Sequence, residues 1–69
     1  MPYNYDKLLG RIVEKVGTQR KFAERMDLSE HSVSSKLNGK SSWRQDEIAK
    51  ACSVLDIRDT EIPSYFFAL

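Results

Sequence analysis

The sequence contains few of the residues that build disulfide frameworks, metal centres or membrane spans. It has one cysteine and one histidine, so an internal disulfide is excluded and a metal ion would lack a ligand set. A single cysteine fits a reducing, cytosolic setting. No run approaches the roughly 20 apolar residues that cross a membrane, and the chain does not open on a signal-peptide pattern. The three glycines form no phosphate-cradling loop.

Catalytic groups are equally scarce. Cys52 has no activating neighbour along the chain, and we expect it to fill the core of its helix. Six acidic residues are most simply capping or solvated surface groups: Asp6, Asp46, Glu47, Asp56, Asp59 and Glu61. We therefore expect no enzyme, no cofactor, no metal and no small-molecule substrate.

Apolar residues recur at helical spacing, and no segment alternates with period two for long enough to form a strand. Asn4 as N-cap and Gly17 as C-terminal stop bound the first predicted helix. Its apolar stripe consists of Tyr5, Leu8, Leu9, Ile12, Val13 and Val16. Chain length adds that residues 1–69 should form one domain, near the lower size limit for a self-supporting core.

Four more helical segments follow. Thr18 can cap a helix over 19–26, and Ser29 can cap another that buries Val33 and Leu37 and stops at 38–39. A capping-box pattern over 42–45 announces a fourth helix, which presents Ile48, Ala51, Cys52 and Leu55. A last short turn covers 60–67. The predicted fold class is all-α, a compact bundle of four to five short helices.

The net charge of +1 conceals an uneven distribution. Residues 1–44 hold nine Lys or Arg against five Asp or Glu, a balance of +4, whereas residues 45–69 hold two against five, a balance of −3. Such polarity can orient a protein on a polyanion such as DNA. An ordinary mixed surface is an equally simple interpretation.

The helix at 29–36 is unusual because its outward face carries small hydrogen-bonding side chains instead of Lys, Glu and Gln. At about 100° per residue, the side opposite Val33 and Leu37 is centred on His31 and Ser35. If this helix enters a DNA groove, its N-terminal turn goes deepest. The candidates for base contacts are Ser29, Glu30, His31, Ser32, Ser34 and Ser35.

Residues 18–40 resemble the helix-turn-helix of the lambdoid phage repressor and Cro family, also called the XRE-type family. The resemblance rests on Thr18-Gln-x-x-Phe-Ala, on Leu28-Ser29, on Val33 and on the closing Leu-Asn-Gly-Lys40. It implies a lambda-repressor-like domain with its helix-turn-helix at about 18–38. The segment 60–69 is most like short Cro-like proteins of phages that infect Gram-positive bacteria.

The family's roles carry over residue by residue. The resemblance implies a regulator that binds a double-stranded, pseudo-palindromic operator, as a weak homodimer completed on the DNA. Candidate contacts to the DNA backbone are Thr18, Gln19, Arg20, Lys36, Asn38, Lys40, Ser41, Ser42 and Arg44. Two departures stand out: Asp27 occupies the usual glycine of the turn, and Glu30 brings negative charge to the base-reading edge. Asp tolerates left-handed geometry, and Glu30 either accepts from a cytosine or complements the helix N-terminus.

The C-terminal segment is rich in aromatic side chains. Tyr65 and Phe66 could close the bundle against the first helix, while Phe67 and Leu69 could form a two-fold contact between protomers. Trp43 could cover the core or contact DNA, and we favour the core. An aromatic tail, near-neutral charge and Glu30 also support an alternative function. In that alternative the scaffold is a protein-interaction module, for example an antirepressor, without DNA binding of its own.

Overall fold

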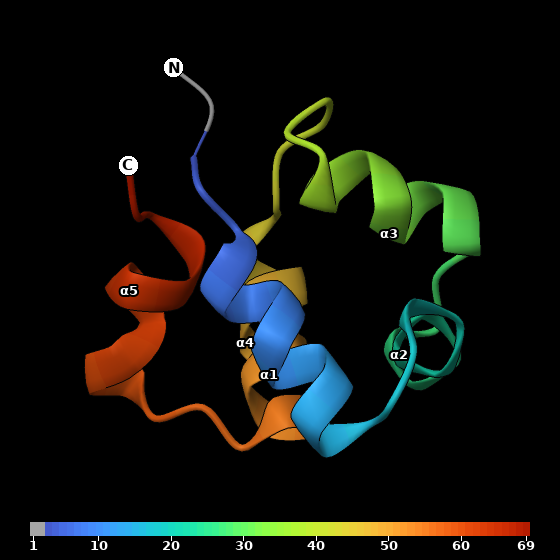
Figure 1. Ribbon diagram of the computed structural model, residues 1–69, viewed down its shortest axis with the longest axis horizontal. Coiled ribbons are helices and arrows are strands. Elements are labelled where there is room, and N and C mark those ends of the chain that lie inside the picture. The colour runs from blue at the N-terminus through green and yellow to red at the C-terminus, as the bar shows by residue number, and fades with distance from the viewer. Residues whose placement is uncertain (1–2) are drawn as a thin grey trace.

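The computed structural model describes residues 3–69, an all-helical fold of five α-helices and one 3₁₀ helix. In Figure 1, α1 and α4 lie together in the middle, α5 covers one end, and α2 and α3 form the other. In chain order the elements are α1 (Asp6–Lys15), α2 (Gln19–Met26), α3 (Glu30–Leu37), α4 (Gln45–Leu55), η1 (Asp59–Glu61) and α5 (Ile62–Phe66). The predicted fold class is confirmed.

Helix α1 begins one residue later than an Asn4 N-cap would place it, because Tyr5 is the residue before its first turn. The Asn4 side chain still accepts the Asp6 backbone N–H at 2.8 Å. The apolar stripe of α1 is buried at Tyr5, Leu8 and Ile12. The prediction that Val13 belongs to this buried stripe is wrong, because its side chain is 65% exposed. Val13 follows Ile12 by about 100° of helical rotation, which takes it past the edge of the buried face.

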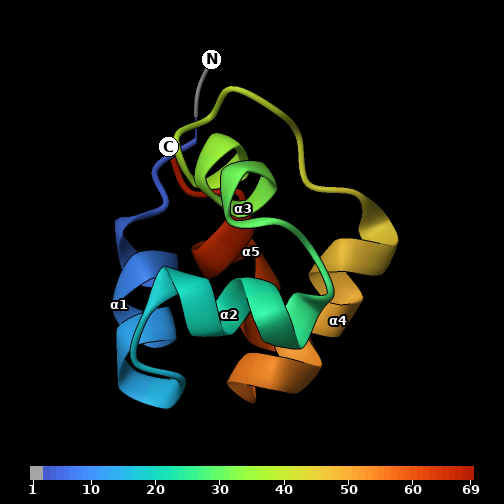
Figure 2. The ribbon, with the colours of Figure 1, turned by 90° about the vertical axis from the view of Figure 1, so that its right-hand side faces the viewer.

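Helices α2 and α3 form a helix-turn-helix, with α3 lying across α2 (Figure 2). Thr18 caps α2 by accepting the Lys21 N–H at 3.1 Å, as its position predicted. The turn passes through Asp27, whose φ of 58° is left-handed. The tolerance of the turn for aspartate is therefore confirmed. Leu28 then turns inward and packs against the core.

Helix α4 starts two residues later than the capping-box pattern predicted. The residue before its first turn is Arg44, and Glu47 accepts the Arg44 backbone N–H at 2.9 Å. Arginine has no acceptor, so only the carboxylate half of a capping box forms. The prediction that Ser42 caps this helix is wrong. At the other end, Asp56 is left-handed, with φ 56°.

Arg11 ties α1 to the end of α4. Its guanidinium donates to the carbonyl oxygens of Leu55 at 2.9 Å and Asp56 at 2.7 Å. These carbonyls are among the groups that a helix C-terminus leaves unpaired, and a cation there is favourable. The contact joins residues 44 and 45 positions apart and keeps both helices in register.

The C-terminal segment folds back along α1, as predicted for Tyr65 and Phe66, which are buried. Lys7 lies over the Tyr65 ring, with its Nζ 4.6 Å from the ring centroid. The Asn4 N–H donates to the Ala68 carbonyl at 2.7 Å. The two ends of the described chain therefore lie side by side, as Figure 1 shows.

One core serves all five α-helices. Its buried members are Tyr5, Leu8, Ile12, Phe22, Ala23, Met26, Val33, Leu37, Ala51, Cys52, Leu55, Ile57, Tyr65 and Phe66. Burial raises the pKa of the Cys52 thiol, and the charge of Asp59 adds to the rise, which fits a core filler and not a nucleophile. Within residues 3–69, none of the helices has the length and apolarity to cross a membrane.

Candidate functional site

The N-terminal turn of α3 is exposed but internally hydrogen-bonded. The Ser29 hydroxyl accepts the Ser32 backbone N–H at 3.0 Å, and the two hydroxyls also lie 3.0 Å apart. Ser29 therefore caps α3, as predicted. Glu30 and His31 are exposed on the first turn. Of the predicted base-reading turn, these two side chains extend freely from the helix surface.

Further along α3 the hydroxyls are also engaged. The Ser34 hydroxyl accepts from Asn38 Nδ2 at 3.2 Å, and the hydroxyls of Ser35 and Ser41 lie 3.3 Å apart. Both serines are half-buried. These contacts secure the end of α3 and the start of the segment after it. A nucleic acid would have to replace or share these hydrogen bonds to use Ser34 or Ser35.

The predicted DNA-backbone residues divide into two groups. At the surface lie Gln19, Arg20, Asn38, Lys40, Ser41, Ser42 and Arg44, together with Thr18, whose hydroxyl caps α2. Two of the exposed cations have acidic neighbours, Arg20 with Glu24 at 4.0 Å and Arg44 with Asp46 at 3.3 Å. Exposed pairs of this kind contribute little to stability and exchange partners readily.

Lys36 belongs to the other group, and its position does not fit the predicted contact with a phosphate. The residue is only 8% exposed. Its Nζ pairs with Glu47 Oε1 at 3.0 Å and donates to the Ser42 carbonyl at 3.0 Å. Because a buried ammonium needs compensating partners, Lys36 is committed to the protein interior and is unavailable to DNA.

Glu47 is the counterpart of Lys36 and was not predicted as a site residue. Burial raises the pKa of its carboxyl, but the hydrogen bond from the Arg44 N–H, the hydrogen bond from Lys36 and the charges of Lys36 and Arg44 outweigh burial. The net result is a pKa below the usual 4.5. Glu47 is therefore ionised at neutral pH and holds Lys36 in place.

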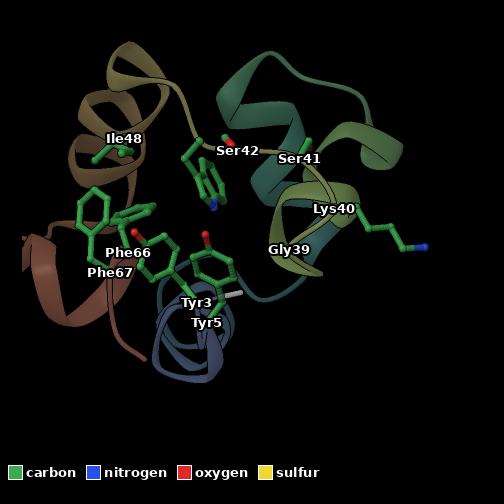
Figure 3. A pocket seen from close by; sticks show the side chains of 10 residues that line it. Tyr3, Tyr5, Gly39, Lys40, Ser41, Ser42, Ile48, Phe66 and Phe67 are labelled. Atoms are coloured by element: carbon green, nitrogen blue, oxygen red, sulfur yellow. The ribbon is translucent and has the colours of Figure 1, made fainter. Parts of the chain in front are cut away.

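An aromatic pocket of about 320 Å³ lies where the two chain ends meet the segment after α3. Its lining residues are Tyr3, Tyr5, Gly39, Lys40, Ser41, Ser42, Trp43, Ile48, Phe66 and Phe67. Figure 3 shows the rings of Tyr3 and Tyr5 reaching into it, while the Lys40 side chain extends away. None of these residues is acidic, and they present apolar walls with hydroxyl groups at hand.

Trp43 forms an inner wall of the aromatic pocket. Its ring packs edge-on against Phe66, with the ring centroids 5.3 Å apart, which confirms the preference for a core role. Its Nε1 is buried without a hydrogen-bond partner among the residues that the structure describes. Buried indole N–H groups usually have a partner, so the hydrogen bond that Trp43 could donate is not made within the described residues.

A second hollow of about 420 Å³ adjoins the pocket between α4 and α5. Ile48 and Phe67 line both hollows, and Asp59 lies at the edge of the second. Phe67 is 47% exposed and Leu69 82% exposed. Tyr65 and Phe66 of the predicted tail contact thus turn inward, whereas Phe67 and Leu69 are exposed, and Phe67 lines both hollows.

Sequence reasoning noticed the tail but missed the pocket. Tyr3 and Tyr5 lie far along the chain from Trp43, and Ile48 is nearby but reads as part of the apolar face of its own helix. The density of aromatic residues at 65–67 was the available signal. Within residues 3–69, no group of His, Cys, Asp and Glu gathers at distances that would hold a metal ion.

Known proteins supply the last comparison. The solution structure of the modulator of repression (MOR) of the temperate bacteriophage TP901-1 from Lactococcus lactis is similar to this chain, with a TM-score of 0.85 and 55% sequence identity. The match covers 97% of this chain and 90% of that one. No curated protein sequence matches. A family model described as protein of unknown function (DUF739) matches residues 1–68, and the chain belongs to that family.

Proposed function

We propose that this chain regulates transcription by binding a repressor protein, as an antirepressor or modulator, and not chiefly by reading DNA itself. The observation that carries the proposal is the 55% identity, across nearly the whole chain, to a phage protein named for modulating repression. Two proteins this similar share a fold. The function of the relative is therefore the first one to test here.

The surface around Phe67 supports a protein partner. Two hollows share Phe67 in their lining, and the Phe67 side chain is itself 47% exposed. Aromatic residues in and beside pockets are the usual anchors of protein interfaces. Exposed apolar groups gathered beside pockets are more informative than the same groups scattered singly over a surface.

Charge indicates which part of a repressor would bind there. Residues 45–69, which form α4, η1 and α5, carry two basic against five acidic residues. Glu47 is enclosed with Lys36, which leaves four acidic residues for this surface: Asp46, Asp56, Asp59 and Glu61. The DNA-binding face of a repressor is basic, because it must approach phosphates. Complementary charge would steer that face toward α4 and α5. Occupation of the face would then release the operator.

The experiment mixes the purified chain with a repressor from the locus that encodes it. Titration calorimetry is expected to show binding, and a labelled operator fragment is expected to leave the repressor as the chain is added. A repressor that keeps its operator and shows no heat of binding with this chain would contradict the proposal.

DNA binding through α3 is the second candidate, together with membership of the XRE-type family. It is favoured by the helix-turn-helix of α2 and α3 and by the exposed Glu30 and His31. Phosphate contacts predict affinity for operator DNA that falls steeply as salt rises. The variants His31→Ala and Ser35→Glu should then weaken binding to the best site. Absent or salt-insensitive binding would favour the protein partner.

A second copy of the chain is the other occupant to consider for Phe67 and Leu69. Pairing through these side chains would be weak in solution and completed on an operator. Sedimentation would find a monomer at low concentration in that case. A tight dimer at nanomolar concentration would contradict weak pairing and would leave the apolar surface covered before any repressor arrives.

A further inference from the structure

Lys36 occupies an uncommon position for a helix cation, because α4 and the segment before it both converge on it. Its Nζ pairs with Glu47 Oε1 of α4 at 3.0 Å and donates to the carbonyl of Ser42 at 3.0 Å. The same atom lies 6.0 Å from the centroid of the Trp43 ring, on its face. Both charged side chains are nearly enclosed, at 11% and 12% exposed.

The segment between α3 and α4, residues 38–44, depends on these contacts for its place. It contributes Ser42 and Trp43 to the aromatic pocket. Its start is secured by Ser35 and Ser41, and its end by the Arg44 N–H on Glu47. Between these points, Lys36 supplies the one charged donor that the described residues direct at the segment's backbone.

We infer that Lys36 is a positioning residue for the repressor-binding surface: it fixes the 38–44 segment so that Trp43 stands as a wall of the aromatic pocket. This inference rests on the proposed function, since it assigns the pocket to the partner. Lys36 itself contacts no partner, because its ammonium is enclosed. It acts through Ser42 and Trp43.

Removing Lys36 alone would confuse position with stability, because Glu47 would be left as a buried, unpaired charge. A double variant separates the two effects. Lys36→Met with Glu47→Gln removes both charges together, which often costs little stability. The glutamine carbonyl still accepts the Arg44 N–H, so the start of α4 is kept. What the double variant lacks is the ammonium that donates to Ser42.

Trp43 reports its own position, since it is the single tryptophan of the chain. The full chain is compared with the double variant, with Lys36→Arg and with Lys50→Met. Lys36→Arg keeps a buried cation, and Lys50→Met removes an exposed lysine from α4. Circular dichroism first verifies that each protein is folded. Emission wavelength, quenching by acrylamide and affinity for the repressor are then measured.

In the folded double variant, Trp43 emission is expected to shift to the red and acrylamide to quench it more strongly. Affinity for the repressor is expected to fall about tenfold, because the 38–44 segment loses one charge-assisted hydrogen bond that orders it. Lys36→Arg should recover most of both signals, and Lys50→Met should match the unaltered chain.

Unchanged emission and quenching in the folded double variant would overturn the positioning role. A changed spectrum with undiminished affinity for the repressor would overturn the link between the segment and the partner. If the unaltered chain binds no repressor, the proposed function fails, while the spectra still decide whether Lys36 positions Trp43.

Discussion

The N-terminal turn of α3 and the aromatic pocket present opposite kinds of surface. On α3, the hydroxyls of Ser29 and Ser32 satisfy each other and the helix end. In the pocket, the Trp43 Nε1 has no hydrogen-bond partner within the described chain, and the Phe67 side chain is about half exposed. The first surface can remain unbound at no cost, whereas the second gains from being covered.

This difference teaches that hydrogen-bonding residue types alone do not identify a binding face. A row of serines on a short helix predicts contacts to DNA bases, yet the same serines can serve as caps and braces of the helix. An aromatic side chain left half-exposed has no such internal use. The stronger claim to a macromolecular partner therefore belongs to the pocket and its rim.

Lys36→Met should give the largest effect and break both regions at once. Leaving Glu47 buried and unpaired is expected to lower the free energy of unfolding by about 3 kcal/mol, against roughly 3–10 kcal/mol for a domain of this size. Urea denaturation measures it, with the exposed Lys50→Met as the matched control. A loss no greater than the control's would show that the pair behaves like a surface salt bridge.

Phe67→Ala should divide the two regions cleanly. We expect affinity for the repressor to fall by about 2 kcal/mol, roughly thirtyfold, as for an aromatic anchor at an interface. Stability should change by less than about 1 kcal/mol, because the ring is 47% exposed. Calorimetry measures the first and thermal unfolding the second. Val13→Ala removes an exposed apolar group from α1 as a control; equal binding by all three proteins would refute the interface.

Ser29→Ala should sharpen the role of the serine face. Loss of the N-cap is expected to lower stability by about 1 kcal/mol, measured by thermal unfolding. Ser29→Asp, which can still accept the Ser32 N–H, should retain most of it. If Ser29→Ala instead keeps full stability and abolishes operator binding, the hydroxyl contacts DNA and is not chiefly a cap.

Acid should weaken the Lys36–Glu47 pair with the smallest effect of the four. The pKa of the Glu47 carboxyl is held below 4.5 by Arg44 and Lys36. The ionised carboxylate therefore stabilises the fold at pH values above its unfolded-state pKa. That stabilisation is lost as the pH falls through the lower, folded-state pKa. Stability of the unaltered chain and of Glu47→Gln is measured from neutral pH downward. Their difference should shrink below pH 4.5; a constant difference would contradict it.

The helices were predictable because their signals are local. Thr18 and Ser29 lie within three residues of the N–H groups that they accept, and the sequence predicts both caps. Asp27 could likewise be placed in the turn, since aspartate tolerates a left-handed backbone. The density of aromatics in the tail indicated that it makes contacts, and the burial of Tyr65 and Phe66 agrees with its predicted packing against the first helix.

What could not be predicted depends on contacts between distant residues. In the sequence, Lys36 is indistinguishable from any other helix cation. The fold pairs it with Glu47 of α4, eleven positions further along, and encloses both side chains. The pocket draws Tyr3 from one end, Phe67 from the other and Trp43 from the middle. Periodicity describes one helix at a time and contains no information about such assemblies.

The hydrogen bond between Asn4 and Ala68 has a practical consequence for any peptide that is fused to this chain. Within residues 3–69, both outer segments of the chain pass the rim of the pocket, where the rings of Tyr3 and Phe67 lie 5.6 Å apart. An affinity tag at either terminus would therefore compete with a partner for the same space. Conversely, a circular permutant that links the two ends would carry its own tether across the rim, and tether length would tune access to the pocket.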